Sequence, residues 1–164
     1  MKRILAVLLS LILMLGMFAG CGKMPDEKLM ALGKEMEDRE NFDKAIEYYE
    51  KLVQEYPESP LAPEAMHYMG KVYANGIKDY ERAILVFNDV IDKYPDSPQA
   101  AHSQFMIGFV YANSIADTAE ARLAYDKFKE KYPDNELIPS VDFELKYLGK
   151  DINDIPELMN LDSK

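Results

Sequence analysis

Apolar residues recur along much of this chain at alternating spacings of three and four, which places them on one face of an α-helix. Two stretches show the pattern in full, and each predicts a helix with a wide apolar face. The first carries Phe42, Ala45, Ile46, Tyr49, Leu52, Val53 and Tyr56, and the second carries Tyr80, Ala83, Ile84, Phe87, Val90, Ile91 and Tyr94. The pattern therefore predicts an all-α fold.

The two stretches belong to a repeat whose step is 38 residues. Tyr-Pro-Glu-Ser-Pro at 56–60 recurs as Tyr-Pro-Asp-Ser-Pro at 94–98 and, less closely, as Tyr-Pro-Asp-Asn at 132–135. The prolines end the helices before them because proline has no amide hydrogen to donate. Ser59 and Ser97, each followed by proline, predict the start of the next helix. Each repeat is therefore predicted to contain two helices.

The other helix of each predicted pair carries a glycine, at Gly33, Gly70 and Gly108. A glycine inside a helix costs about 1 kcal/mol relative to alanine. Three glycines at one phase of the repeat therefore predict three places where the helices of a pair cross too closely for a side chain.

These residues resemble the tetratricopeptide repeat (TPR) family, which has Leu-Gly and Tyr on the first helix of each repeat and Ala, an aromatic residue and a closing Pro after them. The matching residues are Gly33, Ala45, Tyr49 and Pro57; Gly70, Tyr73, Ala83, Phe87 and Pro95; and Gly108, Tyr111, Ala121, Tyr125 and Pro133. The resemblance implies a TPR-type α-solenoid of three helix pairs plus a C-terminal capping helix. The repeats are placed at 25–59, 60–97 and 98–135, and the cap at 136–149.

The last part of the chain has the features of a solenoid end, where a polar outer face is needed. Arg122 and Lys129 replace apolar residues of the earlier stripes, and the predicted cap keeps apolar residues on one face only. Residues 150–164 form an acidic tail that includes the apolar residues Ile152, Ile155, Leu158 and Met159. This tail either folds back as a short helix or extends freely.

The first 21 residues have the pattern of a secretory signal: Lys2-Arg3, an apolar run from Ile4 to Leu15, and small residues before Cys21. Phe18-Ala19-Gly20-Cys21 resembles the lipobox of bacterial lipoproteins. The resemblance implies cleavage after residue 20, a lipid on Cys21 and a short lipidated tether at 21–24. The alternatives are an uncleaved N-terminal anchor and ordinary cleavage that leaves a free thiol.

Charge adds to this expectation. Removal of residues 1–20 takes away Lys2 and Arg3 and changes the formal net charge from −10 to −12. So acidic a protein repels nucleic acid and anionic lipid headgroups. We therefore expect no nucleic-acid partner, and we expect membrane attachment through the lipid on Cys21 alone. Gly22 follows the cysteine, and by resemblance to enteric lipoproteins this favours the periplasmic face of the outer membrane.

Residues that could carry catalysis are few. His67 and His102 lie in different repeats, and no phosphate loop, nucleophile elbow or paired-cysteine motif is present. We therefore expect no enzyme activity, no cofactor and no metal. Met30, Met36, Met66, Met69 and Met106 could line a cofactor pocket, but most match repeat core positions, and packing is the better explanation.

A binding surface is easier to place, because in TPR folds the first helix of each repeat lines a concave groove. Carried over by repeat phase, the resemblance implies a partner-binding groove of Lys34, His67, Lys71, Asn75, His102, Phe105, Phe109 and Asn113, with Met30, Glu37 and Glu64 beside them. Phe105 and Phe109 are four residues apart, so they stack on one helical face and form a candidate peptide anchor. The alternative is that the closing helix or the tail covers them.

The lipobox, the acidic repeats and the Tyr-Pro-x-Ser-Pro junction resemble the BamD family of outer-membrane lipoproteins, and also the TPR domain of YbgF (CpoB). The first resemblance implies a scaffold that mediates protein–protein interactions in outer-membrane protein assembly. The second implies an accessory factor of envelope maintenance. Two further hypotheses stay open. One is an enzyme that acts on the cell wall, or a non-catalytic subunit of a cell-wall enzyme complex, and the other is a domain that oligomerises through its own groove.

Overall fold

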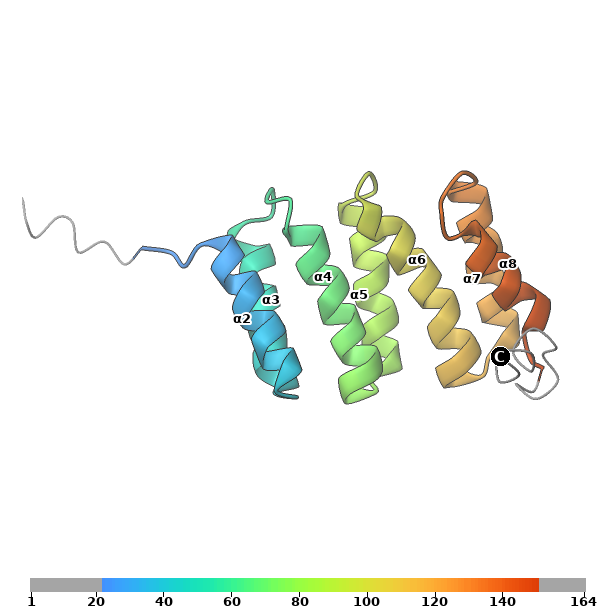
Figure 1. The fold of residues 1–164 in the computed structure, drawn as a ribbon, viewed down its shortest axis with the longest axis horizontal. Helices are drawn as coiled ribbons and strands as arrows, with labels where there is room; N and C mark the ends of the chain where they lie inside the picture. The colour runs from blue at the N-terminus through green and yellow to red at the C-terminus, as the bar shows by residue number, and fades with distance from the viewer. Residues whose placement is uncertain (1–21, 151–164) are drawn as a thin grey trace, which may run out of the picture.

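The computed structural model describes residues 22–150, which form helices joined by short turns (Figure 1). The helical segments are α2 (Asp26–Asp38), α3 (Phe42–Glu55), α4 (Ala62–Lys71), η1 (Val72–Ile77), α5 (Tyr80–Lys93), α6 (Pro98–Val110), η2 (Tyr111–Ile115), α7 (Thr118–Lys131) and α8 (Ile138–Tyr147). The predicted signal segment, Cys21 and most of the predicted acidic tail lie outside the described residues.

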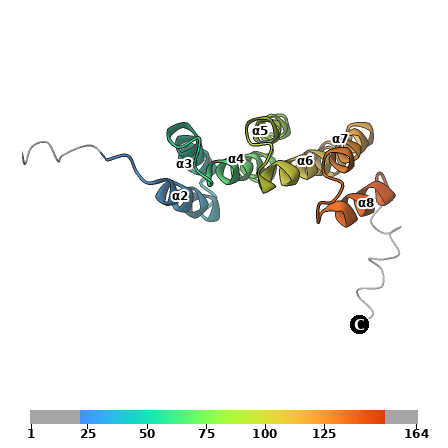
Figure 2. The same ribbon diagram turned by 90° about the horizontal axis from the view of Figure 1, so that it is seen from above.

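The helices stand side by side in chain order and form two layers. Figure 2 shows α2, α4, α6 and α8 in one layer and α3, α5 and α7 in the other. Helix α2 pairs with α3, α4 with α5, and α6 with α7, while each second helix also packs against the first helix of the next pair. The predicted fold class is confirmed: three helix pairs and a closing helix stack into an α-solenoid.

Each pair closes where a glycine of the first helix faces an aromatic ring of the second. A Cβ atom on Gly33 would lie 2.3 Å from the Tyr49 ring, and a Cβ atom on Gly70 would lie 2.5 Å from the Phe87 ring. Gly108 has the same relation to Tyr125, also at 2.5 Å. Because all three rings are fully buried, they have no free space to move into. The prediction that these glycines mark close helix crossings is confirmed.

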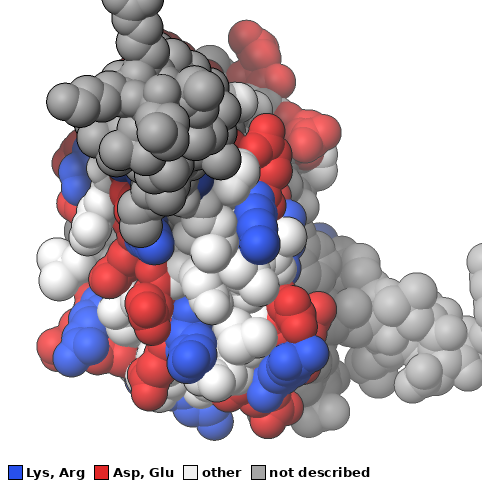
Figure 3. Space-filling model, turned by 90° about the vertical axis from the view of Figure 1, so that its left-hand side faces the viewer, with Lys and Arg blue, Asp and Glu red and all other residues white. Residues whose placement is uncertain are grey.

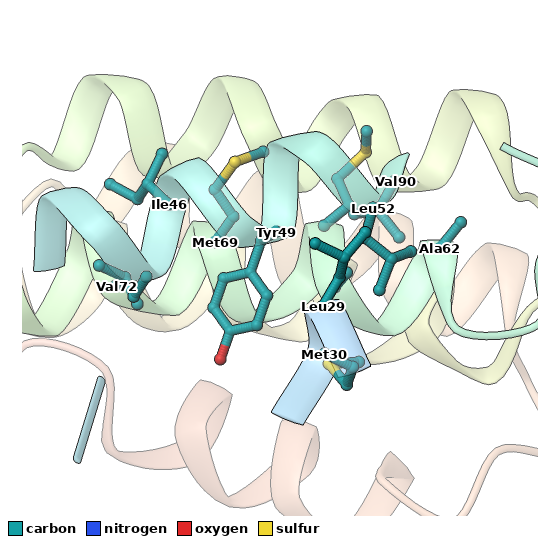
Figure 4. Packing of buried hydrophobic residues seen from close by; sticks show 12 residues of the cluster. Leu29, Met30, Ile46, Tyr49, Leu52, Ala62, Met69, Val72 and Val90 are labelled. Carbon is teal, nitrogen blue, oxygen red and sulfur yellow. The ribbon is translucent and has the colours of Figure 1, made fainter. Parts of the chain in front are cut away.

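The core runs along the whole stack, between the two layers. Figure 4 shows its first part, where Leu29 and Met30 of α2 meet Tyr49 and Leu52 of α3. Of the five methionines considered as a cofactor pocket, Met30, Met66 and Met69 are buried in this cluster. The other two, Met36 and Met106, are partly buried against the core. Packing is therefore the explanation of the methionines.

The first helices of the second and third pairs end in a π-helical turn, η1 or η2, which the apolar periodicity of the sequence does not predict. Twelve positions separate Gly33 from Ala45, whereas thirteen separate Gly70 from Ala83 and Gly108 from Ala121. A π-helix bonds residue i to i+5, so it accommodates one extra residue without breaking the helix. The additional residue of the later repeats is absorbed in this way.

The starts of the helices differ in part from expectation. Helix α4 begins at Ala62, so the prediction that Ser59 starts it is wrong. The Ser59 hydroxyl instead bonds Asp26 of α2 and accepts the amide hydrogen of Leu61. Ser97 does precede α6, but its hydroxyl donates to the carbonyl oxygen of Tyr94 and caps no helix amide. Side-chain caps are found on the second helices α5 and α7, where Asp79 and Asp117 accept amide hydrogens.

Helix α8 closes the stack on α7. Its Val141 is fully buried against Tyr125 and Phe128, and Ile138, Leu145 and Leu148 pack around the same cluster. On the outer side, Lys129 of α7 pairs with Asp142 of α8 at 2.6 Å. Helix α8 thus covers the apolar side of the third repeat and exposes Asp142 and Lys146, together with Phe143, to solvent.

Candidate protein-binding face

The surface formed by the first helices α2, α4 and α6, with η1 and η2, carries the residues predicted to line the groove except Met30, and we call it the first-helix face. At its N-terminal end, Lys34 of α2 pairs with Glu64 of α4 at 2.9 Å. The Lys34 and Lys71 ammonium groups lie 4.7 and 4.8 Å from the centre of the Tyr68 ring. The Tyr68 ring in turn stacks on Tyr49 at 5.9 Å. These contacts form a compact cationic and aromatic cluster.

The two histidines meet at the centre of this face. The His67 ring lies 6.2 Å from His102 and 5.5 Å from Phe87, and its Nδ1 is 2.9 Å from the hydroxyl of the buried Ser103. Burial, followed by the nearby Lys71 and His102, lowers the pKa of His67 to about 4. His67 is therefore neutral at physiological pH and links α4 to α6 as a hydrogen-bonding group. With Ser103 fully buried, this pair offers no accessible nucleophile.

The aromatic pair lies on α6, one repeat further along the stack. The rings of Phe105 and Phe109 stack with their centres 6.4 Å apart, as their spacing predicts. Phe105 also contacts the buried Tyr125 at 5.8 Å and packs against the core of the third repeat. Both phenylalanines are half-buried. Phe105 is thus partly a core residue, while Phe109 extends the aromatic surface along α6.

A carboxyl group closes the C-terminal end of the face. Burial raises the pKa of Glu144 on α8, although the nearby Asn113 and Tyr125 side chains partly oppose the shift. The pKa of Tyr125 is raised in turn, by burial and then by the charge of Glu144. Helix α8 therefore brings an acidic group to the aromatic end of the first-helix face. The repeat phase had not indicated Glu144 because α8 lacks the glycine that marks the other first helices.

The remaining predicted residues are divided between surface and core. Asn75 and Asn113 are exposed on η1 and η2. Met30, which the repeat phase placed in the groove, is only 5% exposed, so its assignment to the groove is wrong. The reason is its contact with the core of the first pair. Tyr68 was missed, since a tyrosine three residues before a lysine is too common a pattern to predict a ring between two ammonium groups.

Charge is mixed over the N-terminal end of the stack. Figure 3 shows Lys and Arg side chains interspersed with Asp and Glu around uncharged residues. Between residues 22 and 150, no three His, Cys, Asp or Glu side chains gather as a metal site would require. In the same range, no helix is long and apolar enough to span a bilayer.

Comparison with known proteins agrees with this geometry. Residues 29–59, 64–97 and 102–135 match the family model described as tetratricopeptide repeat. The chain belongs to the tetratricopeptide repeat family. Repeats of this family mediate contacts between proteins, which makes the chain an interaction scaffold. The first-helix face is the side on which the family's groove is expected.

No curated protein matches the chain in sequence. Among solved structures, the TPR2AB-domain:pHSP90 complex of yeast Sti1 has a similar fold, with a TM-score of 0.60 and 21% sequence identity. The match covers 74% of this chain and 47% of the yeast chain. This chain thus spans about half of the length of that relative, and the likeness bears on the fold alone.

Proposed function

We propose that this chain is a lipid-anchored, non-catalytic TPR scaffold of the bacterial cell envelope. It holds a protein or an extended peptide on the first-helix face, at the periplasmic side of the outer membrane. The observation that carries the proposal is the arrangement of that face. A cationic and aromatic cluster, two histidines and a phenylalanine pair lie on consecutive first helices, and none of them is needed to close a helix pair in the way that Tyr49, Phe87 and Tyr125 are.

The chemistry of the face supports a peptide rather than a small molecule. Aromatic residues are enriched where proteins bind one another, and a few such anchor residues provide most of the binding energy in these contacts. The face extends over three first helices, α2, α4 and α6. An extended segment can contact several repeats at once, whereas a small molecule would contact one.

The lipid anchor rests on the lipobox resemblance at Cys21. Only three residues, 22–24, separate Cys21 from Pro25 at the start of α2. A tether of four residues reaches at most about 14 Å, so the anchor would keep the solenoid next to the membrane. Replacement of Cys21 by Ser should move the protein from the membrane fraction to the soluble fraction. Retention of the C21S protein in the membrane would contradict lipid anchoring through this residue.

The resemblance to the BamD family extends the proposal to outer-membrane protein assembly. The present chain has three matched repeats, fewer than the five of that family. The partner is therefore proposed to be a component of the assembly process. The contacts that the BamD family makes through its later repeats are not assigned to this chain.

In-cell photo-crosslinking tests the binding face directly. A photoreactive amino acid placed at Lys71, Phe105 or Phe109 should give a covalent adduct with one partner protein, identified by mass spectrometry. Leu85 is the matched control, since it is 66% exposed but lies on the second-helix layer. An adduct from Leu85 alone, or from none of the four positions, would overturn a scaffold that binds through the first-helix face.

A further inference from the structure

Three residues mark one level across the first-helix face. Lys34, Lys71 and Phe109 each directly follow a glycine that faces an aromatic ring of the second helix, namely Gly33, Gly70 and Gly108. Since the three glycines have the same packing, the residues after them have the same height and direction on α2, α4 and α6. A ligand that crosses the face at this level therefore meets an ammonium group, a second ammonium group and then a phenyl ring.

The two lysines differ in their available charge. The Lys34 ammonium is neutralised by Glu64 at 2.9 Å, and that contact raises the pKa of Lys34. No ion pair within 4.0 Å involves Lys71 among residues 22–150. The Lys71 ammonium rests instead on the Tyr68 ring at 4.8 Å. In a chain with a formal net charge of −10, the Lys71 ammonium is thus a cation that the Tyr68 ring positions on the first-helix face without neutralising its charge.

The next position along this level is apolar. Phe109 is half-buried and stacks on Phe105, so its ring is held in place on one side. A fixed, partly exposed ring favours a bulky aliphatic or aromatic side chain, which removes apolar surface from water. The cation and the ring thus favour two different side chains of one ligand.

Geometry sets the spacing between these side chains. Helices α4 and α6 contact one another through His67 and His102, whose rings lie 6.2 Å apart. Because the axes of helices in contact are about 10 Å apart, positions at one level of α4 and α6, such as Lys71 and Phe109, are expected at an interval of about 10 Å. An extended peptide advances about 3.3 Å per residue. Three residues of extended peptide therefore match the interval.

We infer that the first-helix face binds an extended segment carrying an acidic side chain on Lys71 and, three residues away, a bulky apolar side chain on Phe109. This inference rests on the proposed function and specifies the chemistry of its partner. An internal acidic side chain is the ligand group.

A peptide selection tests the inference. The full chain, held in neutral detergent, is used to select from displayed random nonapeptides with a fixed flanking sequence at both ends. Enriched peptides should contain Asp or Glu three residues from Leu, Ile, Met or Phe, in either chain direction. K71E should replace the acidic preference by Lys or Arg, and F109A should remove the apolar preference but leave the acidic one. K44E, the same charge change on exposed Lys44 of α3, should leave the selection unchanged.

Binding of one selected peptide with blocked ends gives the magnitude. K71A should weaken it about tenfold, the loss of a charge-assisted contact. A peptide with Gln in place of its acidic residue should bind the parent chain and K71A with affinities within about a factor of two of each other. For the acidic peptide, high salt should reduce the difference in affinity between the parent chain and K71A. Circular dichroism checks that K71A and F109A remain folded.

The failures are distinguishable. Peptides that are enriched without the spaced pair, or a selection that K71E leaves unchanged, would overturn the inference and leave the binding face intact. If the parent chain enriches no peptide relative to F109A, the result would count against both the inference and the proposed binding face. A chain ending at Lys150 that binds peptides more than tenfold tighter would identify residues 151–164 as the occupant, and concentration-dependent dimers abolished by K71E would identify a second copy. Either result would overturn the proposed partner.

Discussion

Contacts between single residues decide how closely the helices of each pair approach. Gly33, Gly70 and Gly108 have no Cβ atom, and the rings of Tyr49, Phe87 and Tyr125 occupy the space that a Cβ atom would need. The helix-propensity cost of a glycine, about 1 kcal/mol per position, is thus offset by close packing of a large buried ring. This exchange recurs three times, so it is a property of the repeat and not of one site.

Replacement of Gly70 by alanine should therefore destabilise the protein despite the higher helix propensity of alanine. The new methyl group would lie 2.5 Å from the buried Phe87 ring. Overpacking costs about 1–3 kcal/mol, and the gain in propensity returns about 1 kcal/mol. A net loss of about 1–2 kcal/mol in the free energy of unfolding is expected from urea titration.

A second substitution separates the clash from other effects. F87L removes the ring atoms that the methyl group meets, so G70A should cost less in the F87L background, by at least about 1 kcal/mol of coupling. Additive costs in the double variant would show that the close contact at Gly70 is not the cause.

His67 carries the pH dependence expected at the residue scale. Its folded pKa is about 4, below the ordinary 6.5, because burial and the nearby Lys71 and His102 disfavour the charged ring. The unfolded chain therefore binds the proton first as the pH falls. The contribution of neutral His67 to the free energy of unfolding is complete above pH 6.5. It is lost as the pH drops from about 6.5 to 4, by about 3 kcal/mol in total.

Comparison of the parent chain with H67Q isolates this contribution. The free energy of unfolding of the parent chain minus that of H67Q should decrease as the pH is lowered from 6.5 to 4. The carboxyl groups are common to both proteins, so their contributions cancel in this difference. Nuclear magnetic resonance of the His67 ring should show a midpoint well below that of an exposed histidine. A midpoint near 6.5 would contradict the account of burial.

At the scale of the elements, the turns between paired helices are the irregular feature. In the first pair, α2 closes with the Asn41 amide bonded to the Met36 carbonyl, five residues back. In the later pairs, the Asp79 and Asp117 amides bond Tyr73 and Tyr111, six residues back. Every one of these turns contains a non-glycine residue with positive φ: Glu40, Lys78 or Ala116. The extra residue thus widens the turn but keeps its left-handed end.

Glycine at such a position should stabilise the protein. Ala116 has φ of 63°, where a Cβ atom costs about 1–2 kcal/mol. Because glycine also has more freedom in the unfolded chain, we expect A116G to raise the free energy of unfolding by about 0.5–1 kcal/mol. The same substitution at Ala31, exposed within α2, should lower it by about 1 kcal/mol. If thermal unfolding shows that glycine changes the stability in the same direction at Ala116 and at Ala31, backbone strain at Ala116 would be excluded.

At the scale of the whole molecule, the stack depends on what covers its ends. Helix α8 buries Val141 fully against Tyr125 and Phe128. A solenoid unit contacts only its neighbours, so exposure of the last unit leaves apolar surface that no other part of the chain covers. The cap is therefore a solubility device as well as a source of stability.

V141D should detach α8, since a buried unpaired carboxylate is strongly unfavourable. We expect a loss of about 3 kcal/mol in stability, faster amide exchange in α7, and concentration-dependent association in analytical ultracentrifugation. S140D, at the exposed neighbouring position, should change stability by no more than about 0.5 kcal/mol. A monomeric V141D protein with parent-like exchange would show that α8 is dispensable.

The sequence by itself determined the properties that depend on local periodicity. Helix faces, the three-pair solenoid and the glycine crossings follow from the 3.6-residue turn together with a repeat that places Gly33, Gly70 and Gly108 at one phase. The count of thirteen between Gly70 and Ala83 was also visible. It did not show whether a loop or a π-helical turn would absorb the extra residue.

The tertiary structure decided which side chains of neighbouring helices meet. Gly76 of η1 leaves room for the Phe42 ring of α3, 2.7 Å from where a Cβ atom would lie, and that contact accompanies the π-helical turn. The meeting of Tyr68 with two lysines, the burial of Met30 and the approach of Glu144 to the aromatic end likewise depend on helix spacing and side-chain rotamers. These are non-local quantities, because a shift of a few ångströms between helices changes the contact while leaving the sequence pattern the same.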